Sequence, residues 1–306
     1  MTSTERKQAR YERRKTKRES KKMKFIKSLG TYEEVFSYSN LFNSFRYCKQ
    51  GVRWKASIQS YEINLPVNTF EIYNKLKKLK WKSKGFNTFK ICERGKMREI
   101  KSVHISERCI QRCLCDNYLV PLLSHNLIYD NGASLKNKGT SFTMDRLKKH
   151  LHRYYNYNGN DGYILTFDFS NYFGNINHEK LFETTDKLIL DENIRKLYHQ
   201  LIEAFDSGIG LGSQVSQISA VAFPNKLDHY FKDKLGVRYY ARFMDDGYII
   251  EKDINKINDY KNILYEICNE LDIKINPKKI KVSKLSHTFT FLKKEILINE
   301  NRPNCY

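Results

Sequence analysis

The stretch Val237-Arg-Tyr-Tyr-Ala-Arg-Phe-Met-Asp245-Asp246-Gly247-Tyr-Ile-Ile250 places two aromatic and β-branched runs on either side of a short polar tip. Asp-Gly between such runs is the strongest short-range signal for a β-hairpin, so we expect a hairpin with two adjacent carboxylates at its tip. Adjacent like charges repel unless a cation neutralises them, and Mg²⁺ prefers oxygen ligands. A plain surface turn would produce the same Asp-Asp-Gly pattern.

A second stretch, Gly162-Tyr-Ile-Leu-Thr-Phe-Asp168-Phe-Ser-Asn-Tyr-Phe173, carries an aspartate at the end of a β-rich apolar run. Aspartate is depleted in strands and costly to bury, so it needs a cation or a hydrogen-bond donor there. A helix N-cap just after a strand is the ordinary alternative. Taken together, Asp168 and Asp245 predict a carboxylate cluster assembled from adjacent strands, as two-metal phosphoryl transfer requires.

Composition limits the class of protein. The chain has 306 residues, with 55 Lys and Arg against 34 Asp and Glu, so its formal charge is +21. A hydrophobic content of 40% excludes a disordered tail, and no apolar run reaches the roughly 18–20 residues of a membrane span. Seven cysteines without a CxxC pair favour reduced thiols and a cytoplasmic protein. The excess positive charge predicts a polyanionic partner, with nucleic acid as the first candidate.

Several further segments can be assigned from their patterns. Residues 1–30 form a basic arm, mobile or helical, which contacts phosphates or serves only as a solvated tail. Residues 32–80 have helical periodicity, and residues 87–105 alternate around a turn at Glu93–Lys96, which predicts a hairpin. A helix is expected from Ser106 to Leu119, stopping before Pro121, because proline disfavours a helical residue before it. Another helix is expected over residues 141–154. We expect Cys109, Cys113 and Cys115 to be small core residues rather than metal ligands.

In combination, these motifs resemble those of reverse transcriptases over most of residues 90–292. Asp168 with an aromatic five residues later resembles the first catalytic motif, and Phe243-Met244-Asp245-Asp246 resembles the Tyr-x-Asp-Asp box with Phe in place of Tyr. The stretch 208–217 lies where the family has its Gly-rich template motif, and residues 271–292 resemble the last palm motifs. Residues 98–121 resemble the fingers of bacterial and group II intron-like enzymes.

The resemblance implies an α+β, right-hand polymerase fold with fingers and a ferredoxin-like palm sheet that carries the catalytic β-hairpin. The implied division is a basic arm at 1–30, fingers at 31–160, a palm at 161–292 interleaved with part of the fingers, and a residual segment at 293–306. Only fourteen residues follow Leu292, so the thumb of relatives is expected to be short or absent. The protein is expected to be bacterial or phage-encoded.

The resemblance also assigns roles. Asp168, Asp245 and Asp246, with the carbonyl of Phe169, would hold two Mg²⁺ ions, for which Mn²⁺ can substitute. Lys279 would protonate the leaving pyrophosphate, with Lys278 as the rival and surface charge as the alternative for both. Phe173 corresponds to the steric gate against the 2′-hydroxyl, its alternative being a core aromatic. The remaining assignments are nucleotide contacts at Arg98, Lys90 and Gln217, and template or primer contacts at Gly210, Gly212, Ser213 and Leu292.

The Gly-rich motif at residues 208–217 indicates which kind of reverse transcriptase the chain resembles. Leu211-Gly212 followed by Ser216-Gln217 is similar to the enzymes of diversity-generating retroelements, which copy RNA with errors at adenines. The alternatives are an antiphage defence reverse transcriptase with a non-coding RNA, and a non-catalytic nucleic-acid-binding protein on a polymerase fold. The implied partners are a structured template RNA, the DNA product and dNTPs, with no membrane. An accessory protein, self-association or the RNA would supply the grip of the thumb; Phe291-Leu292-Lys293 lacks the glycine that usually ends the primer-grip motif.

Overall fold

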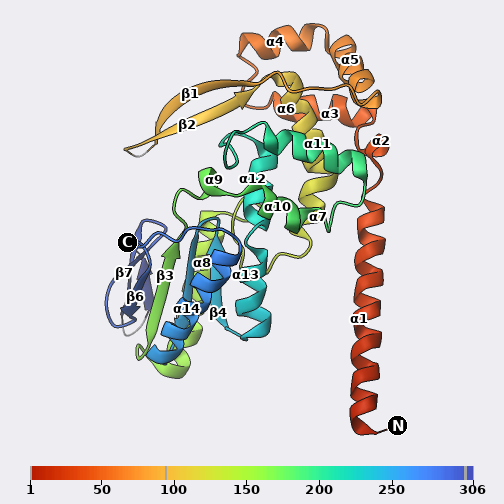
Figure 1. The fold of residues 1–306 in the computed structure, drawn as a ribbon. Coiled ribbons are helices and arrows are strands. Elements are labelled where there is room, and N and C mark those ends of the chain that lie inside the picture. The colour runs from red at the N-terminus through yellow and green to blue at the C-terminus, as the bar shows by residue number, and fades with distance from the viewer. Residues whose placement is uncertain (1, 94, 300–301, 306) are drawn as a thin grey trace.

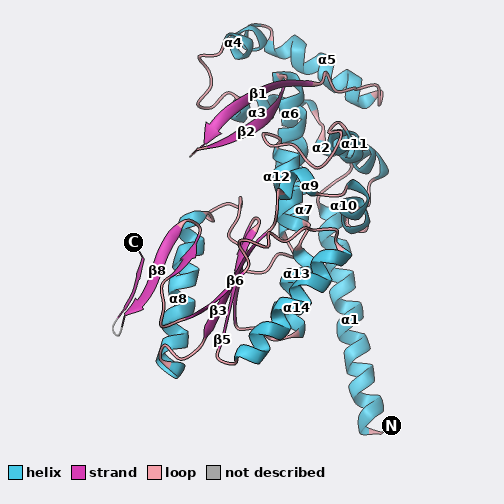
Figure 2. Cartoon of the chain, turned by 60° about the vertical axis from the view of Figure 1, so that its left-hand side comes forward, coloured by secondary structure: helices cyan, strands magenta, loops and turns pink. Residues whose placement is uncertain are grey.

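The structure is a computed structural model that describes residues 2–93, 95–299 and 302–305. Its upper part in Figure 1 is mostly helical and carries a long two-stranded hairpin, whereas its lower part is built around a four-stranded sheet. The helix α1 (Ser3–Ser28) begins near the N-terminus and runs as a single straight rod beside the lower part. Figure 2 shows that the small sheet near the C-terminus lies on the side of the molecule away from α1.

The upper part confirms the helical periodicity and the hairpin expected from the sequence. Its first helices bury apolar side chains at helical spacing, such as Leu41 with Phe45 and Ile72 with Leu76. The hairpin strands pair antiparallel from Phe86↔Val103 to Glu93↔Lys96. The elements are α2 (Tyr32–Val35), α3 (Tyr38–Cys48), α4 (Ala56–Ile63), α5 (Leu65–Lys77), β1 (Phe86–Glu93) and β2 (Lys96–Val103).

The helix expected to stop before Pro121 continues through it, so that boundary was wrong. Helix α6 (Ile105–Leu114) passes into a π-helical turn, η1 (Cys115–Leu119), and then into α7 (Val120–Ser124). Pro121 lies in the first turn of α7, directly after the π-helical turn η1. The N-cap of α6 is His104, whose ring nitrogen accepts the Ser106 N–H at 3.2 Å.

The lower part is organised around an antiparallel sheet of order β4-β5-β3-β6. Helices join β3 to β4 and β5 to β6, and β4 and β5 are joined by a tight turn. The strands are β3 (Tyr163–Asp168), β4 (Tyr239–Phe243), β5 (Asp246–Glu251) and β6 (Lys281–Lys284). The helices that accompany this sheet are α8 (Thr140–Asn158), α13 (Asn225–His229), the π-helical η2 (Tyr230–Lys234) and α14 (Ile254–Glu270). Four further helices lie level with α6 and α7 in Figure 1, where α12 contacts both of them: α9 (Tyr172–Asn175), α10 (His178–Thr185), α11 (Glu192–Glu203) and α12 (Gln214–Ala222).

Both faces of this sheet are covered, which fixes its strand ends in space. Leu165, Phe167 and Ile249 belong to the large core shared with α14 and the upper helices. Ile164 and Tyr248 point the other way, into a second core with α8 and the C-terminal strands. That alternation follows from the two-residue period of a strand.

The last residues form more structure than the residual segment expected for 293–306. Strands β7 (Phe289–Phe291), β8 (Lys294–Asn299) and β9 (Arg302–Cys305) make a three-stranded antiparallel sheet. Leu292 and Lys293 form the turn between β7 and β8 with φ angles of 49° and 63°. Glycine is favoured in such a turn because it has no Cβ, yet the hairpin forms without one.

Two other expectations concern single features. Cys109, Cys113 and Cys115 are at most 2% exposed, which confirms that they are core residues. Within residues 2–93, 95–299 and 302–305, no helix combines the length and apolar character needed to cross a bilayer.

Candidate active site

Three carboxylates lie together at one end of the four-stranded sheet. Asp168 ends β3 and is directly opposite Asp246, the first residue of β5, so their side chains share a face. The Phe169 N–H donates to the carbonyl of Asp245 at 3.1 Å, which fixes Asp245 beside the end of β3. Asp168 is 5% exposed, and Asp245 and Asp246 are half-buried.

The hairpin turn lies two residues earlier than the Asp-Gly signal indicated. Phe243 pairs with Asp246, so the turn residues are Met244 and Asp245, and Met244 has the positive φ of 56°. Gly247 is instead inside β5, opposite Phe167. A Cβ at position 247 would lie 2.2 Å from the Phe167 ring, so this glycine is required by packing rather than by the turn.

Burial and mutual repulsion raise the pKa values of Asp245 and Asp246. Burial, followed by the charges of Asp245 and Asp168, raises the pKa of Asp246 to about 7. Burial also raises the pKa of Asp245, with a contribution from Asp168 that Lys279 and Arg98 oppose. The site therefore favours a bound cation, because only a positive charge allows all three groups to ionise together.

Lys279 supplies one such charge. Its Nζ lies 2.6 Å from Asp168 Oδ2, and Asn276 donates its backbone N–H to the Asp168 carbonyl at 2.8 Å. Burial alone would lower the pKa of Lys279, but the hydrogen bond and charge of Asp168 raise it. The neighbouring Lys278 is exposed, and its backbone N–H donates to the Asn276 side chain at 3.1 Å. Of the two rival lysines, Lys279 is therefore the one at the carboxylates.

The donor set suits Mg²⁺. Across the described ranges, no group of three or more His, Cys, Asp and Glu side chains is arranged as a ready metal cluster. Asp168 is engaged by Lys279, but Asp245 and Asp246 have raised pKa values that a divalent cation would reverse. Oxygen-only ligands with few protein carboxylates match the way Mg²⁺ binds alongside substrate phosphates. Asp168, Asp245 and Asp246, with the Phe169 carbonyl, would hold the metal.

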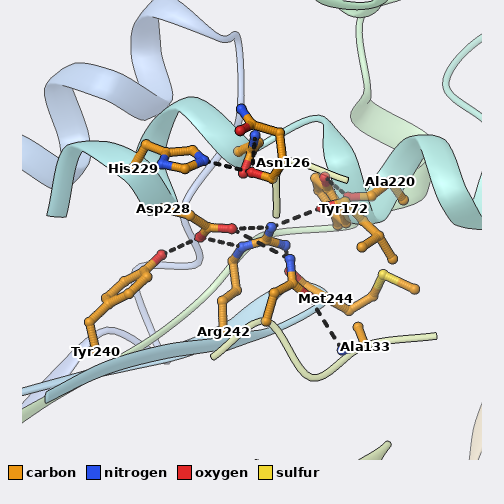
Figure 3. A network of polar contacts seen from close by, with 12 residues as sticks. Asn126, Ala133, Tyr172, Ala220, Asp228, His229, Tyr240, Arg242 and Met244 are labelled. Carbon is orange, nitrogen blue, oxygen red and sulfur yellow. Dashed lines mark hydrogen bonds and ion pairs between the residues drawn. The ribbon is translucent and has the colours of Figure 1, made fainter. Parts of the chain in front are cut away.

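Sequence reasoning missed the buried ion pair that supports the turn. Arg242 is fully buried, and its Nε and Nη2 donate to the two carboxylate oxygens of Asp228 at 2.8 and 2.7 Å (Figure 3). The Tyr240 hydroxyl donates to the same carboxylate at 2.6 Å. Bidentate pairing of this kind offsets part of the large cost of burying two charges.

The same guanidinium reaches the turn between β4 and β5. Arg242 Nη1 donates to the carbonyl of Met244 at 2.7 Å, and Nη2 also donates to the carbonyl of Val221 at 2.9 Å. Met244 precedes Asp245 directly and has an unfavourable backbone conformation, so a fixed carbonyl there restrains the turn. The only sequence signal was an arginine two residues before the turn, within a strand that is otherwise aromatic and apolar.

The hairpin β1–β2 places its two candidate cations on opposite faces. Arg98 is opposite Ile91, whereas Lys90 is opposite Glu99, one register step away. The positive charge of Arg98 lowers the pKa of Asp245, so its face of the hairpin is directed towards the carboxylates. Lys90 is exposed on the other face. The structure therefore associates Arg98, and not Lys90, with the site.

Phe173 lies in α9, five residues after Asp168, and is partly buried. Its ring meets Tyr172 edge to face at 5.9 Å, and its carbonyl accepts the N–H of Ile209 at 2.7 Å. Gly208 makes this contact possible, because it has a φ of 59° and a Cβ there would lie 2.4 Å from the Phe173 carbonyl. The Gly-rich segment thus holds Phe173 in place.

The rest of that segment contacts the hairpin β1–β2. Leu211 accepts the Lys101 N–H at 3.2 Å, and Gly212 lies against Ile100 with a φ of 103°. Ser213 is 3% exposed and caps α12, with its hydroxyl also donating to Gln111. Gly210 lies against the Phe205 ring, and Gln217 is exposed on α12.

Most of the chain matches one known protein family. Residues 80–295 match the family described as "Reverse transcriptase (RNA-dependent DNA polymerase)". The chain belongs to the reverse transcriptase family. No curated protein matches it.

Solved structures show the same fold. Telomerase from Candida tropicalis, truncated from its C-terminal domain, has a TM-score of 0.54 at 13% identity over 72% of this chain and 54% of that chain. Telomerase from Candida albicans in complex with the TWJ fragment of telomeric RNA has a TM-score of 0.55 at 12% identity, covering 70% and 45%. This reverse transcriptase chain spans about half the length of those telomerases, with a mixed α+β fold in common.

Proposed function

We propose that the protein catalyses RNA-templated DNA synthesis by metal-dependent nucleotidyl transfer. The observation that carries the proposal is that Asp168, Asp245 and Asp246 converge at one end of the four-stranded sheet. Arg98 of the hairpin β1–β2 faces them. In this proposal the four-stranded sheet is the palm and residues 31–160 are largely the fingers. Bound Mg²⁺ would activate the primer 3′-hydroxyl and stabilise the leaving pyrophosphate.

Other side chains would bind the triphosphate, select the sugar, protonate the pyrophosphate and contact the primer. Arg98 is placed to bind the triphosphate, for which a planar guanidinium is suited. Phe173 would lie beneath the incoming sugar and exclude a 2′-hydroxyl. Lys279 is kept protonated by Asp168, so it can move to the pyrophosphate and donate a proton there. Leu292, in the turn between β7 and β8, would contact the primer.

A primer-extension assay on an RNA template tests the proposal. We expect Asp245→Asn to abolish Mg²⁺-dependent dNTP incorporation, with a loss of about a thousandfold or more, because a metal ligand is removed. Asp272→Asn is the matched control, since Asp272 is exposed and its carboxylate accepts from the Asn177 side chain at 3.2 Å. Equal incorporation by wild type and Asp245→Asn would favour a non-catalytic nucleic-acid-binding protein.

The finer subtype is proposed to be that of diversity-generating retroelements. The support is the Leu211-Gly212 and Ser216-Gln217 pattern, together with the exposure of Gln217 near the template segment. Sequencing the products against the template separates the possibilities. Substitutions concentrated opposite adenines would support this subtype, whereas repetitive or untemplated DNA would favour a defence enzyme.

A further inference from the structure

Helix α1 stands away from the body of the protein over most of its length. From Glu5 to Lys24 every side chain except that of Ala9 is exposed. The helix is anchored near its C-terminal end, where Phe25 stacks on His125 at 3.9 Å and Ile26 is buried. A cavity of about 720 Å³ separates its Arg18–Lys22 turn from α7, α10 and α13. This exposure needs an explanation, because isolated helices are marginal in water.

The charges of α1 are segregated into stripes. Arg10, Lys17 and Lys24 are seven residues apart and therefore lie in line, almost two turns from one to the next. Glu5, Glu12 and Glu19 have the same spacing but are offset by five residues, which places them about 140° around the helix. The helix consequently has a basic face and a narrow acidic stripe on nearly opposite sides.

Segregation of this kind is unfavourable for the isolated helix. Four-residue steps bring like charges together along two rows, Arg6–Arg10–Arg14–Arg18–Lys22 and Arg13–Lys17–Lys21. Of the described residues, no lysine or arginine between positions 6 and 24 forms an ion pair. A helix selected only for solubility would alternate opposite charges at these spacings. A polyanion on the basic face would relieve the repulsion.

We propose that α1 is a second nucleic-acid-binding surface, whose ligand is a double-stranded segment of RNA. The basic residues from Arg6 to Lys24 extend over about 27 Å, so they can follow a duplex backbone. A membrane is a poor ligand, because Tyr11 and Met23 are the large apolar side chains exposed between residues 5 and 24. The choice of RNA rests on the proposed function, whereas the binding face does not.

This surface is separate from the carboxylate site. In both views α1 lies nearer to α13 than to the sheet that contains β8, and it extends away from the hairpin β1–β2 (Figures 1 and 2). RNA on α1 would therefore be a structured part of the molecule outside the segment being copied. It would hold the template by counterion release while the copied strand moves through the site.

Fluorescence anisotropy with a blunt, 3′-blocked RNA hairpin, its stem longer than α1, tests the proposal without nucleotides. We expect Arg10→Gln/Lys17→Gln/Lys24→Gln to weaken binding about tenfold or more and to reduce the slope of log Kd against log[KCl] by about two to three. Unchanged affinity and slope would overturn the proposal. The same triple variant should extend a short primed template that lacks a stem at the wild-type rate. This second assay distinguishes failure of the α1 proposal from failure of the polymerase proposal.

Two control variants distinguish a face from net charge. Glu5→Gln/Glu12→Gln/Glu19→Gln should bind as tightly as wild type or more tightly. Arg10→Glu with Glu12→Arg keeps the net charge but places a carboxylate on the basic face, so it should weaken binding; wild-type affinity here would contradict a defined face. Equal binding of a DNA duplex of the same sequence would overturn the RNA assignment. Equal displacement by polyglutamate would instead indicate an acidic protein partner.

Discussion

Arg242 and the cations of α1 show two opposite uses of the same charge. Arg242 is fully buried, paired bidentately with Asp228, and fixed to the carbonyl that precedes Asp245. The cations of α1 are exposed and unpaired within the described residues. A buried charge without a partner is very costly, so burial imposes pairing and geometry. An exposed charge costs little and stays available to a ligand. Buried Arg242 therefore positions the backbone beside Asp245, whereas the exposed cations of α1 can bind a ligand.

The largest expected effect comes from breaking the buried pair. Arg242→Met leaves the buried Asp228 carboxylate without its counter-charge, so we expect a loss of about 3–5 kcal/mol of unfolding free energy in urea denaturation. Arg242→Met/Asp228→Leu removes both charges and should regain much of that stability. Primer extension should stay low in the double variant, with a raised Mg²⁺ requirement, because Met244 still lacks its donor. Wild-type activity in a stable double variant would show that Arg242 is only structural.

The next effect concerns the unneutralised carboxylates. The pKa of Asp246 is raised to about 7, above its value of about 3.9 in the unfolded chain, so the folded state binds the proton more tightly. Without Mg²⁺, stability should therefore fall as pH rises from about 4 to about 7, by about 2–4 kcal/mol. Thermal unfolding should show this fall, and Mg²⁺ should reverse it at pH 8 but not at pH 5. Asp246→Asn should remove most of the dependence.

An intermediate case is Asp130, a buried carboxylate shared by two cations, Arg146 and Lys232, with the ring of His150 close by. Arg146 Nε lies 2.5 Å from its Oδ1, Lys232 Nζ 2.9 Å from its Oδ2, and His150 3.6 Å from its Oδ2. Arg146→Met removes one donor but leaves Lys232, so we expect a loss of about 1–2 kcal/mol in urea denaturation. A loss as large as that of Arg242→Met would contradict the idea that shared pairing protects a buried charge.

The smallest effect is expected on α1. Arg10→Gln/Lys17→Gln/Lys24→Gln should leave the Tm within about 1 °C of wild type, because exposed charges contribute little to folding. Differential scanning calorimetry at low and moderate salt checks this. A marked fall in Tm would mean that the arm is part of the folded body, and the contrast with Arg242 would lose its basis.

Much of the fold followed from local patterns. The hairpin at 86–103 and the helices of residues 32–80 follow from periodicity, and the β-rich runs ending at Asp168 and flanking Asp245 form strands. The errors occurred where packing outweighed local preference. Gly247 looked like a turn residue but is required by the Phe167 ring, and Pro121 looked like a helix end but lies in the first turn of α7.

The sequence by itself determined which chemistry the protein can perform, because aspartates at the ends of apolar runs and a strongly basic composition are readable from residue type and spacing. Only the tertiary structure decided which groups act together: that Lys279 rather than Lys278 reaches Asp168, that Arg98 rather than Lys90 faces Asp245, and that Arg242 and Asp228 secure the turn. The physical reason is that local sequence encodes the period of a strand or a helix. Contacts between residues far apart in the chain depend on strand register and on the pairing that burial enforces.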